Sequence, residues 1–198
     1  MNSGQGLQQS LLSSNDFELF NLPLTFNLNR QLLDERWKNL QRTAHPDNFS
    51  VQDTASQRIA MQYSVRINEA YQRLKLPLKR AAYLCELNGA SIKAEENTRM
   101  PSDFLIQQMQ WREQLEDADS FLEIGKLQQE VLAAKESAFA RCETYLDVDK
   151  HWMHAAGEVR TLMFMERFED DIDKRRDQFG RTPLWGRRCD HCFSILGR

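Results

Sequence analysis

Hydrophobic residues recur along most of this chain at the three- and four-residue spacing of amphipathic helices, and no β-strand pattern is seen. Two such segments lie in the first half. The first can be capped by Asn27 or Asn29, and its apolar face comprises Leu28, Leu32, Leu33, Trp37, Leu40 and Ala44. The second begins at Asp53 or Thr54, and its apolar face comprises Ala55, Ile59, Tyr63, Ile67, Ala70 or Tyr71, and Leu74. A short loop joins them, which predicts an antiparallel helical hairpin.

A single capped turn of helix is predicted ahead of the hairpin, because Asn15 can cap it and Pro23 ends it. We expect its apolar residues to fold back onto the hairpin; they are Phe17, Leu19, Phe20 and Leu22. The hairpin ends near Pro77, and residues 78–87 predict a short connecting helix.

Three more helical patterns follow a polar break at residues 89–101; they cover residues 102–117, 120–146 and 149–179. Short connections between long helices predict antiparallel neighbours and therefore a three-helix bundle. The fold class is thus all-α, with an N-terminal helical unit at 16–76, a helical linker at 77–101 and the bundle at 102–179. The flanking residues 1–15 and 180–198 are predicted to be disordered.

The first helix of the predicted bundle carries two apolar faces. At 100° per residue one side comprises Phe104, Gln108, Trp111 and Leu115. The other comprises Leu105, Ile106, Met109 and Glu113. Either this second side is exposed as a partner-binding patch, or the helix is buried on most sides. In the third helix the stripe with Val159 and the stripe with Phe164 and Phe168 compete, and the pattern leaves open which faces inward.

The loop of the predicted hairpin contains His45-Pro46-Asp47. Pro46 fixes its own φ and disfavours helical geometry at His45, so the first helix has to stop there. His45 and Asp47 are then held on a short loop between two helices, where functional residues are common. An acid–base pair would need a cleft and a nucleophile, and neither accompanies them, so we predict that the chain is not an enzyme.

This arrangement resembles the J-domain of the DnaJ co-chaperones. The resemblance is carried by 16–20, the basic helix through Arg42, His45-Pro46-Asp47 and 67–74. It implies that residues 16–76 form a J-domain that docks on a DnaK-type chaperone and triggers ATP hydrolysis. The implied chaperone-binding residues are His45, Pro46, Asp47, Arg36, Lys38 and Arg42. Ala44 and Asn48 depart from the aromatic residue and the lysine that J-domains commonly carry there.

A closer resemblance is to the HscB family, the J-proteins dedicated to iron–sulfur cluster assembly. It is carried by 77–84, 102–116 and 159–164. It implies that the C-terminal bundle binds the cluster scaffold IscU and that the chaperone is HscA. The implied scaffold-binding residues are Leu105, Ile106, Met109, Gln110, Glu113, Asp117 and Phe164. Gln110 stands where the family usually has glutamate, so one contact loses its charge assistance.

Charge is unevenly distributed along the chain, whose net charge is −3. Residues 30–75 hold eight Lys or Arg against five Asp or Glu, whereas residues 103–150 hold five against eleven. This asymmetry favours two surfaces for two different partners, although both could be solvated helix faces. The sequence pI of 5.9 disfavours nucleic-acid binding. No apolar run is long enough to span a membrane, and no Lys or Arg precedes residue 30, so we predict a bacterial cytoplasmic location.

The cysteines predict neither a disulfide framework nor a metal site. Cys85 and Cys142 fall in helical segments and are expected to be buried. Cys189 and Cys192 form half of a zinc site, but zinc requires four ligands and no second pair exists. There is no glycine-rich phosphate loop, so we expect no cofactor and expect ATP to be bound by the partner.

The sequence therefore predicts a co-chaperone that binds IscU, delivers it to HscA and stimulates the HscA ATPase, which assists iron–sulfur cluster maturation and transfer. Two alternatives remain at this point. One is a general J-protein that delivers unfolded chains to DnaK. The other is a helical metal-binding or nucleic-acid-binding protein that uses the basic helix and the Cys189/Cys192 segment.

Overall fold

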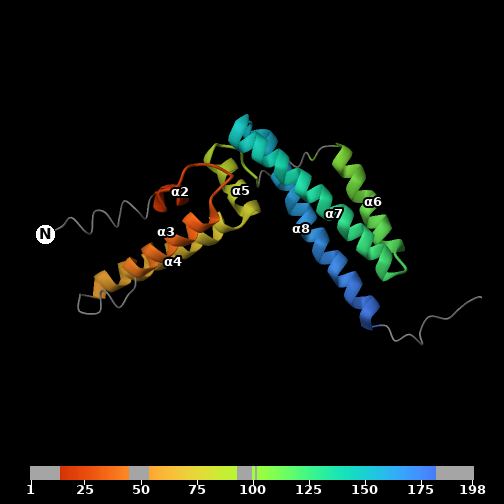
Figure 1. Cartoon of the computed structure of the whole chain (residues 1–198), viewed down its shortest axis with the longest axis horizontal. Coiled ribbons are helices and arrows are strands. Elements are labelled where there is room, and N and C mark those ends of the chain that lie inside the picture. Colours follow the sequence, from red (N-terminus) through yellow and green to blue (C-terminus); the bar gives the residue numbers. More distant parts are fainter. Residues whose placement is uncertain (1–13, 45–53, 93–99, 101, 182–198) are drawn as a thin grey trace, which may run out of the picture. The chain divides into compact units, whose positions relative to one another are not determined.

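The computed structural model describes residues 14–44, 54–92, 100 and 102–181. All regular structure within these ranges is helical, which confirms the all-α prediction. The elements are α2 (Asp16–Leu19), α3 (Arg30–Ala44), α4 (Thr54–Lys75), α5 (Pro77–Leu87), α6 (Ser102–Asp117), α7 (Phe121–Glu143), the π-helical turn η2 (Thr144–Val148) and α8 (Trp152–Arg181) (Figure 1). They divide into two compact units, one within Met1–Arg99 and Ala138–Arg160, the other within Met100–Ser137 and Thr161–Arg198.

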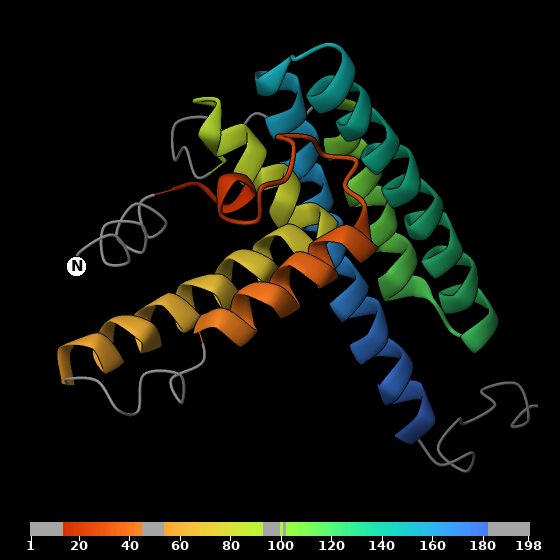
Figure 2. The same cartoon turned by 60° about the vertical axis from the view of Figure 1, so that its left-hand side comes forward.

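In the first unit α3 and α4 lie side by side as the predicted hairpin (Figure 2). The Asn29 side chain accepts a hydrogen bond of 3.1 Å from the Leu32 N–H, so Asn29 rather than Asn27 caps α3. Trp37 stacks on Tyr71 with ring centroids 4.6 Å apart and donates to the Asn68 side chain. The residues buried between α3 and α4 include Leu33, Ala60, Tyr63, Ile67, Ala70 and Leu74.

The short helix α2 is anchored to the hairpin, as the sequence predicted. Asn15 and Glu18 form a capping box, in which each side chain accepts from the backbone N–H of the other residue. The Asp16 carboxylate is fully buried and is paired with Arg66 at 2.7 Å and with Arg73 at 2.9 Å. A buried carboxylate requires such partners, so α2 is held by charge as well as by its apolar residues.

The first unit also contains α5, η2 and the adjoining ends of α7 and α8. Cys85 on α5 and Cys142 on α7 are fully buried, as predicted. Asp147 in η2 accepts hydrogen bonds from the backbone N–H groups of Phe26 and Asn27, at 2.7 Å and 2.8 Å. These bonds hold the segment before α3 against the turn between α7 and α8. The sequence does not predict this contact. The proposed limits of linker and bundle, at 77–101 and 102–179, remain a prediction.

In the second unit α6, α7 and the later part of α8 bury a common core. Trp111 of α6 is 1% exposed, stacks on Phe168 of α8 at 6.0 Å, and donates its indole N–H to Glu130 of α7 at 2.8 Å. Further buried residues are Leu115, Ala118, Ile124, Leu127, Val131, Leu162, Met165 and Ile172. The Trp111 and Leu115 side of α6 therefore faces inward, and the helix is not buried on most sides.

Among the described residues, no helix is both long and apolar enough to cross a bilayer. The same part of the chain contains no group of three or more His, Cys, Asp or Glu that could hold a metal ion. Cys189 and Cys192 lie outside the described residues.

Candidate protein-docking site

The outward side of α6 exposes three large apolar side chains. Leu105 is 41% exposed, Ile106 58% and Met109 69%. They stand opposite Trp111 because i, i+1 and i+4 positions share one side of a helix while i+6 lies across from it. Large apolar side chains exposed next to each other on one side of a helix are typical of binding surfaces.

Three polar residues extend this apolar patch along α6. Gln110, Glu113 and Asp117 are all exposed and follow one another at three- and four-residue spacing. The structure thus brings six of the seven predicted scaffold-binding residues to one side of one helix. We call this set the α6 face; it comprises Leu105, Ile106, Met109, Gln110, Glu113 and Asp117.

Phe164, the seventh predicted residue, lies on α8 and is half-buried. Its ring meets Phe104 of α6 edge to face, with centroids 5.5 Å apart, and stacks on Phe168 at 6.0 Å. The guanidinium group of Arg112 lies 5.5 Å from the centre of the Phe164 ring. Phe164 therefore packs against the inward side of α6, and only part of its ring is exposed.

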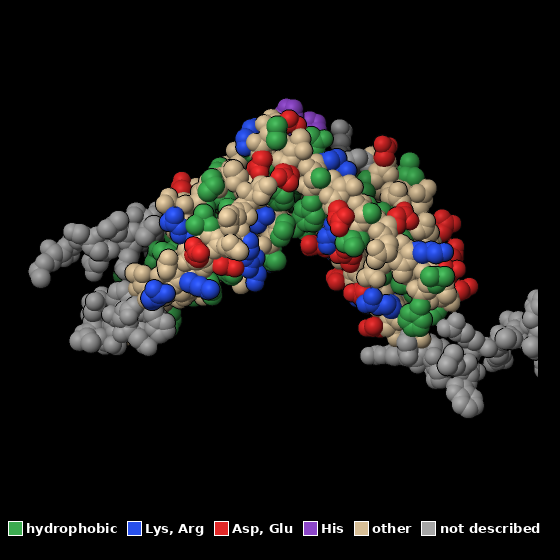
Figure 3. Space-filling model, in the orientation of Figure 1, with side chains coloured by type: hydrophobic (Ala, Val, Ile, Leu, Met, Phe, Trp, Pro, Cys, Tyr) green, Lys and Arg blue, Asp and Glu red, His purple; other side chains and the backbone are tan. Residues whose placement is uncertain are grey.

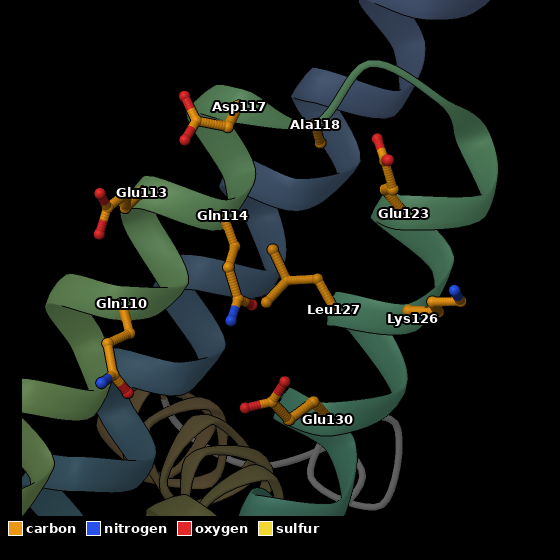
Figure 4. A pocket seen from close by; sticks show the side chains of 9 residues that line it. All are labelled: Gln110, Glu113, Gln114, Asp117, Ala118, Glu123, Lys126, Leu127 and Glu130. Atoms are coloured by element: carbon orange, nitrogen blue, oxygen red, sulfur yellow. The ribbon is translucent and has the colours of Figure 1, made fainter.

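A groove of about 680 Å³ runs between α6 and α7, and its walls are shown in Figure 4. The α6 wall includes three residues of the α6 face; its lining residues are Gln110, Glu113, Gln114 and Asp117. Ala118, between the two helices, also lines the groove. The α7 wall comprises Glu123, Lys126, Leu127 and Glu130. Sequence reasoning missed the α7 wall, although the spacing 123, 126, 127 and 130 marks one side of a helix.

The groove is acidic, with four carboxylates against one lysine. Glu130 accepts the Trp111 indole N–H and the Gln107 amide at the same oxygen, Oε1, and Figure 4 shows its carboxylate turned toward α6. Hydrogen bonds from the Asp119 backbone N–H and from Ser120 hold the pKa of Glu123 below its ordinary value. Figure 3 shows acidic side chains gathered over this part of the second unit.

The second predicted site is the basic side of α3. Lys38 and Arg42 are exposed and Arg36 is half-exposed. Basic side chains are visible over the α3–α4 hairpin in Figure 3. Arg30 at the start of α3 is bound to Asp34 at 2.8 Å; partial burial opposes ionisation, but hydrogen bonds from Tyr71 and Arg30 hold the pKa of Asp34 below its ordinary value. His45, Pro46 and Asp47 lie outside the described residues.

A short capped helix packed on an antiparallel hairpin with a basic helix, followed by a helical bundle with an exposed apolar side, is the arrangement of J-domain co-chaperones. Residues 100–173 match the family described as the HSCB C-terminal oligomerisation domain. The chain is 42% identical over 164 residues to the co-chaperone protein HscB homolog of Burkholderia thailandensis, covering 81% of this chain and 93% of the relative. The homolog of Bordetella petrii is 39% identical over 168 residues, covering 84% and 98%.

Solved structures agree with these relatives. The chaperone HscB from Vibrio cholerae superposes with a TM-score of 0.71 at 34% identity, covering 84% of this chain and 99% of that one. Human co-chaperone protein HscB, at 24% identity and a TM-score of 0.76, covers 83% of each chain and shares the fold. The chain belongs to the HscB family of co-chaperones.

Proposed function

We propose that this chain binds the iron–sulfur scaffold IscU through the α6 face and delivers it to the DnaK-like chaperone HscA, whose ATPase it stimulates. The observation that carries the proposal is the exposure of Leu105, Ile106 and Met109 on α6, while Trp111 on the same helix is buried. The proposal places this activity in the bacterial cytoplasm and assigns the chain a role in cluster maturation and transfer.

The energetics of the α6 face suit a protein partner. Each Å² of apolar surface removed from water contributes about 25 cal/mol, so covering Ile106 and Met109 can contribute a few kcal/mol. Glu113 and Asp117 at the edge of the apolar residues would favour a partner with a basic rim and would speed its association. Gln110 can still donate and accept hydrogen bonds, but it adds no charge to the contact.

The chaperone-binding role is proposed for the α3 side of the first unit. Arg36, Lys38 and Arg42 would bind acidic groups on HscA, and the loop with His45, Pro46 and Asp47 would trigger hydrolysis. Because one chain holds both partners, the scaffold would be at high effective concentration near the peptide site of the chaperone. The chemical step belongs to the chaperone, and the chain itself is proposed to supply no catalytic group.

The testing experiment is a steady-state ATPase assay of HscA with this chain, with IscU, and with both. Synergy when both are present supports a scaffold-specific co-chaperone. Stimulation that is indifferent to IscU would leave the J-domain role standing and would overturn the scaffold assignment.

Two variants separate the two sites. Asp47→Asn should abolish stimulation and leave IscU binding intact, and unchanged stimulation would contradict the role proposed for the loop. Met109→Ala should weaken IscU binding and leave IscU-independent stimulation intact. The matched control is Met61→Ala, because Met61 on α4 is 62% exposed and lies outside the α6 face.

A further inference from the structure

The groove between α6 and α7 continues from the α6 face, and its α7 wall has no part in the proposed scaffold contact. Glu123 and Glu130 on that wall add two carboxylates to Glu113 and Asp117. Two exposed apolar side chains, Phe121 and Leu122, directly precede Glu123 on α7 and are 53% and 68% exposed. A ligand for this surface would combine arginine or lysine with large apolar residues.

The end of α8 lies at the same end of the second unit. The Phe179 ring is 5.9 Å from that of Phe121, and Arg175 donates to the backbone carbonyl groups of Glu116 and Ala118 at 3.1 Å and 3.3 Å. The chain continues past Arg181 with residues 182–198, which lie outside the described residues. This segment therefore starts within a turn or two of helix from the mouth of the groove.

The composition of this segment matches the groove. Arg187, Arg188 and Arg198 stand against a single acidic side chain, Asp190, and the apolar residues are Leu184, Trp185, Phe193, Ile195 and Leu196. The order also fits, because Leu184 and Trp185 come first and the two adjacent arginines follow. The matched family domain ends at residue 173, ahead of this segment.

The segment is long enough to fill the groove. An extended chain advances about 3.3 Å per residue, so Arg187 can lie about 20 Å beyond Arg181. The sixteen residues of α6 span about 24 Å at 1.5 Å per residue. Leu184 and Trp185 can then reach Phe121 and Leu122, while the arginines reach the carboxylates deeper in the groove.

We infer that residues 182–198 dock in cis along the α6–α7 groove, with Arg187 and Arg188 against its carboxylates. Because Glu113 and Asp117 belong to both surfaces, the docked segment competes with the partner of the α6 face. The docking stands by itself, whereas the competition rests on the proposed function. A segment that covers the groove about nine-tenths of the time weakens the apparent affinity of the partner about tenfold.

The test labels the segment in the full-length chain. Cys192→Ser leaves Cys189 as the thiol for a nitroxide, since Cys85 and Cys142 are buried and burial raises the pKa of each thiol to about 12. Paramagnetic broadening of amide signals is then measured by NMR. We expect loss of signal at Glu113, Lys126 and other groove residues, and recovery at high salt or in Arg187→Glu/Arg188→Glu.

Three results would overturn the inference. One is broadening that does not favour the groove over the opposite side of α7, for which Glu136 serves as reference. Another is broadening that persists unchanged in the charge-reversed variant. The third is broadening seen in isotope-labelled chains only when spin-labelled copies are mixed in, which would mean that a second copy is the occupant.

Titration with IscU tests the competition separately. The charge-reversed variant should bind IscU up to about tenfold more tightly than the wild type. Equal affinity of the variant and the wild type for IscU would contradict the competition but not the docking of residues 182–198. If neither chain binds IscU, the proposed function fails, and the broadening still decides whether the segment occupies the groove.

Discussion

Replacing Asp147 by asparagine should loosen the segment that leads into α3. Both carboxylate oxygens accept from backbone N–H groups, Oδ1 from Phe26 at 2.7 Å and Oδ2 from Asn27 at 2.8 Å. Asparagine keeps one acceptor oxygen and turns an NH₂ group toward the other N–H. The substitution therefore removes one charge-assisted hydrogen bond, weakens the second and creates a donor–donor contact.

The magnitude follows from the number and kind of these bonds. A hydrogen bond to a charged group contributes about 1.5–3 kcal/mol, and the lower value applies because the Asn27 bond is exposed. Two such bonds give about 3 kcal/mol, of which a neutral bond retained by asparagine keeps about 1 kcal/mol. The expected loss of about 2 kcal/mol corresponds to a roughly 30-fold rise in the local opening equilibrium.

Amide hydrogen exchange measured by NMR reads this opening at the Phe26 and Asn27 amides directly. Asp149→Asn is the matched control, because Asp149 is a nearby exposed aspartate that makes no side-chain hydrogen bond within the described residues. Protection of the two amides should fall about 30-fold in Asp147→Asn and remain unchanged in Asp149→Asn. Equal protection in the wild type and in Asp147→Asn would refute the reasoning.

Three further predictions concern the core, the α6 face and the thiols. Asp16→Asn should lower the free energy of unfolding, measured by urea titration, by about 2 kcal/mol. Breaking a fully buried ion pair costs about 3–5 kcal/mol, and the loss is smaller here because Arg66 and Arg73 are partly exposed. Met109→Ala should weaken IscU binding by about 1–2 kcal/mol by calorimetry without lowering stability, while Met61→Ala should change neither. Burial holds the pKa of Cys85 and of Cys142 at about 12, so the folded chain keeps two protons that the unfolded chain loses above pH 9. The free energy of unfolding should therefore fall as pH rises from about 9 to about 12. Cys142→Ala removes one of the two thiols, so it should make this fall shallower by about 1.4 kcal/mol per pH unit. An unchanged pH dependence in Cys142→Ala would contradict the prediction.

The sequence by itself determined the helices and most of their buried faces. Asn15, Pro23 and the apolar spacing around Leu33 and Ile67 act within a few residues of chain, and such local signals are sufficient to define caps and amphipathic faces. Periodicity also identified the two apolar faces of α6, but it left open whether the second face is exposed or buried, and the structure exposes it. Of the seven residues that the resemblance to the HscB family implied, six lie together on this side of α6, and Phe164 lies on α8.

Only the tertiary structure decided between alternatives that are equivalent locally. Asn27 and Asn29 are equally good caps, but Asn27 binds Glu143 through its side chain and Asp147 through its backbone, which leaves Asn29 for the helix. On α8 both predicted stripes contribute buried residues, Val159 from one and Phe168 from the other. The helix changes its buried side because residues up to Arg160 and residues from Thr161 belong to different compact units.

The α7 wall of the groove is a further feature that only the tertiary structure decided. Glu123 and Glu130 follow helical spacing like many solvated charges, and nothing in their own sequence distinguishes them. Glu130 becomes part of a site because Trp111, nineteen residues earlier, is packed inward and donates its indole N–H to the carboxylate. Local sequence determines which residues share a side of a helix, whereas the pairing of helices far apart in the chain determines what that side meets.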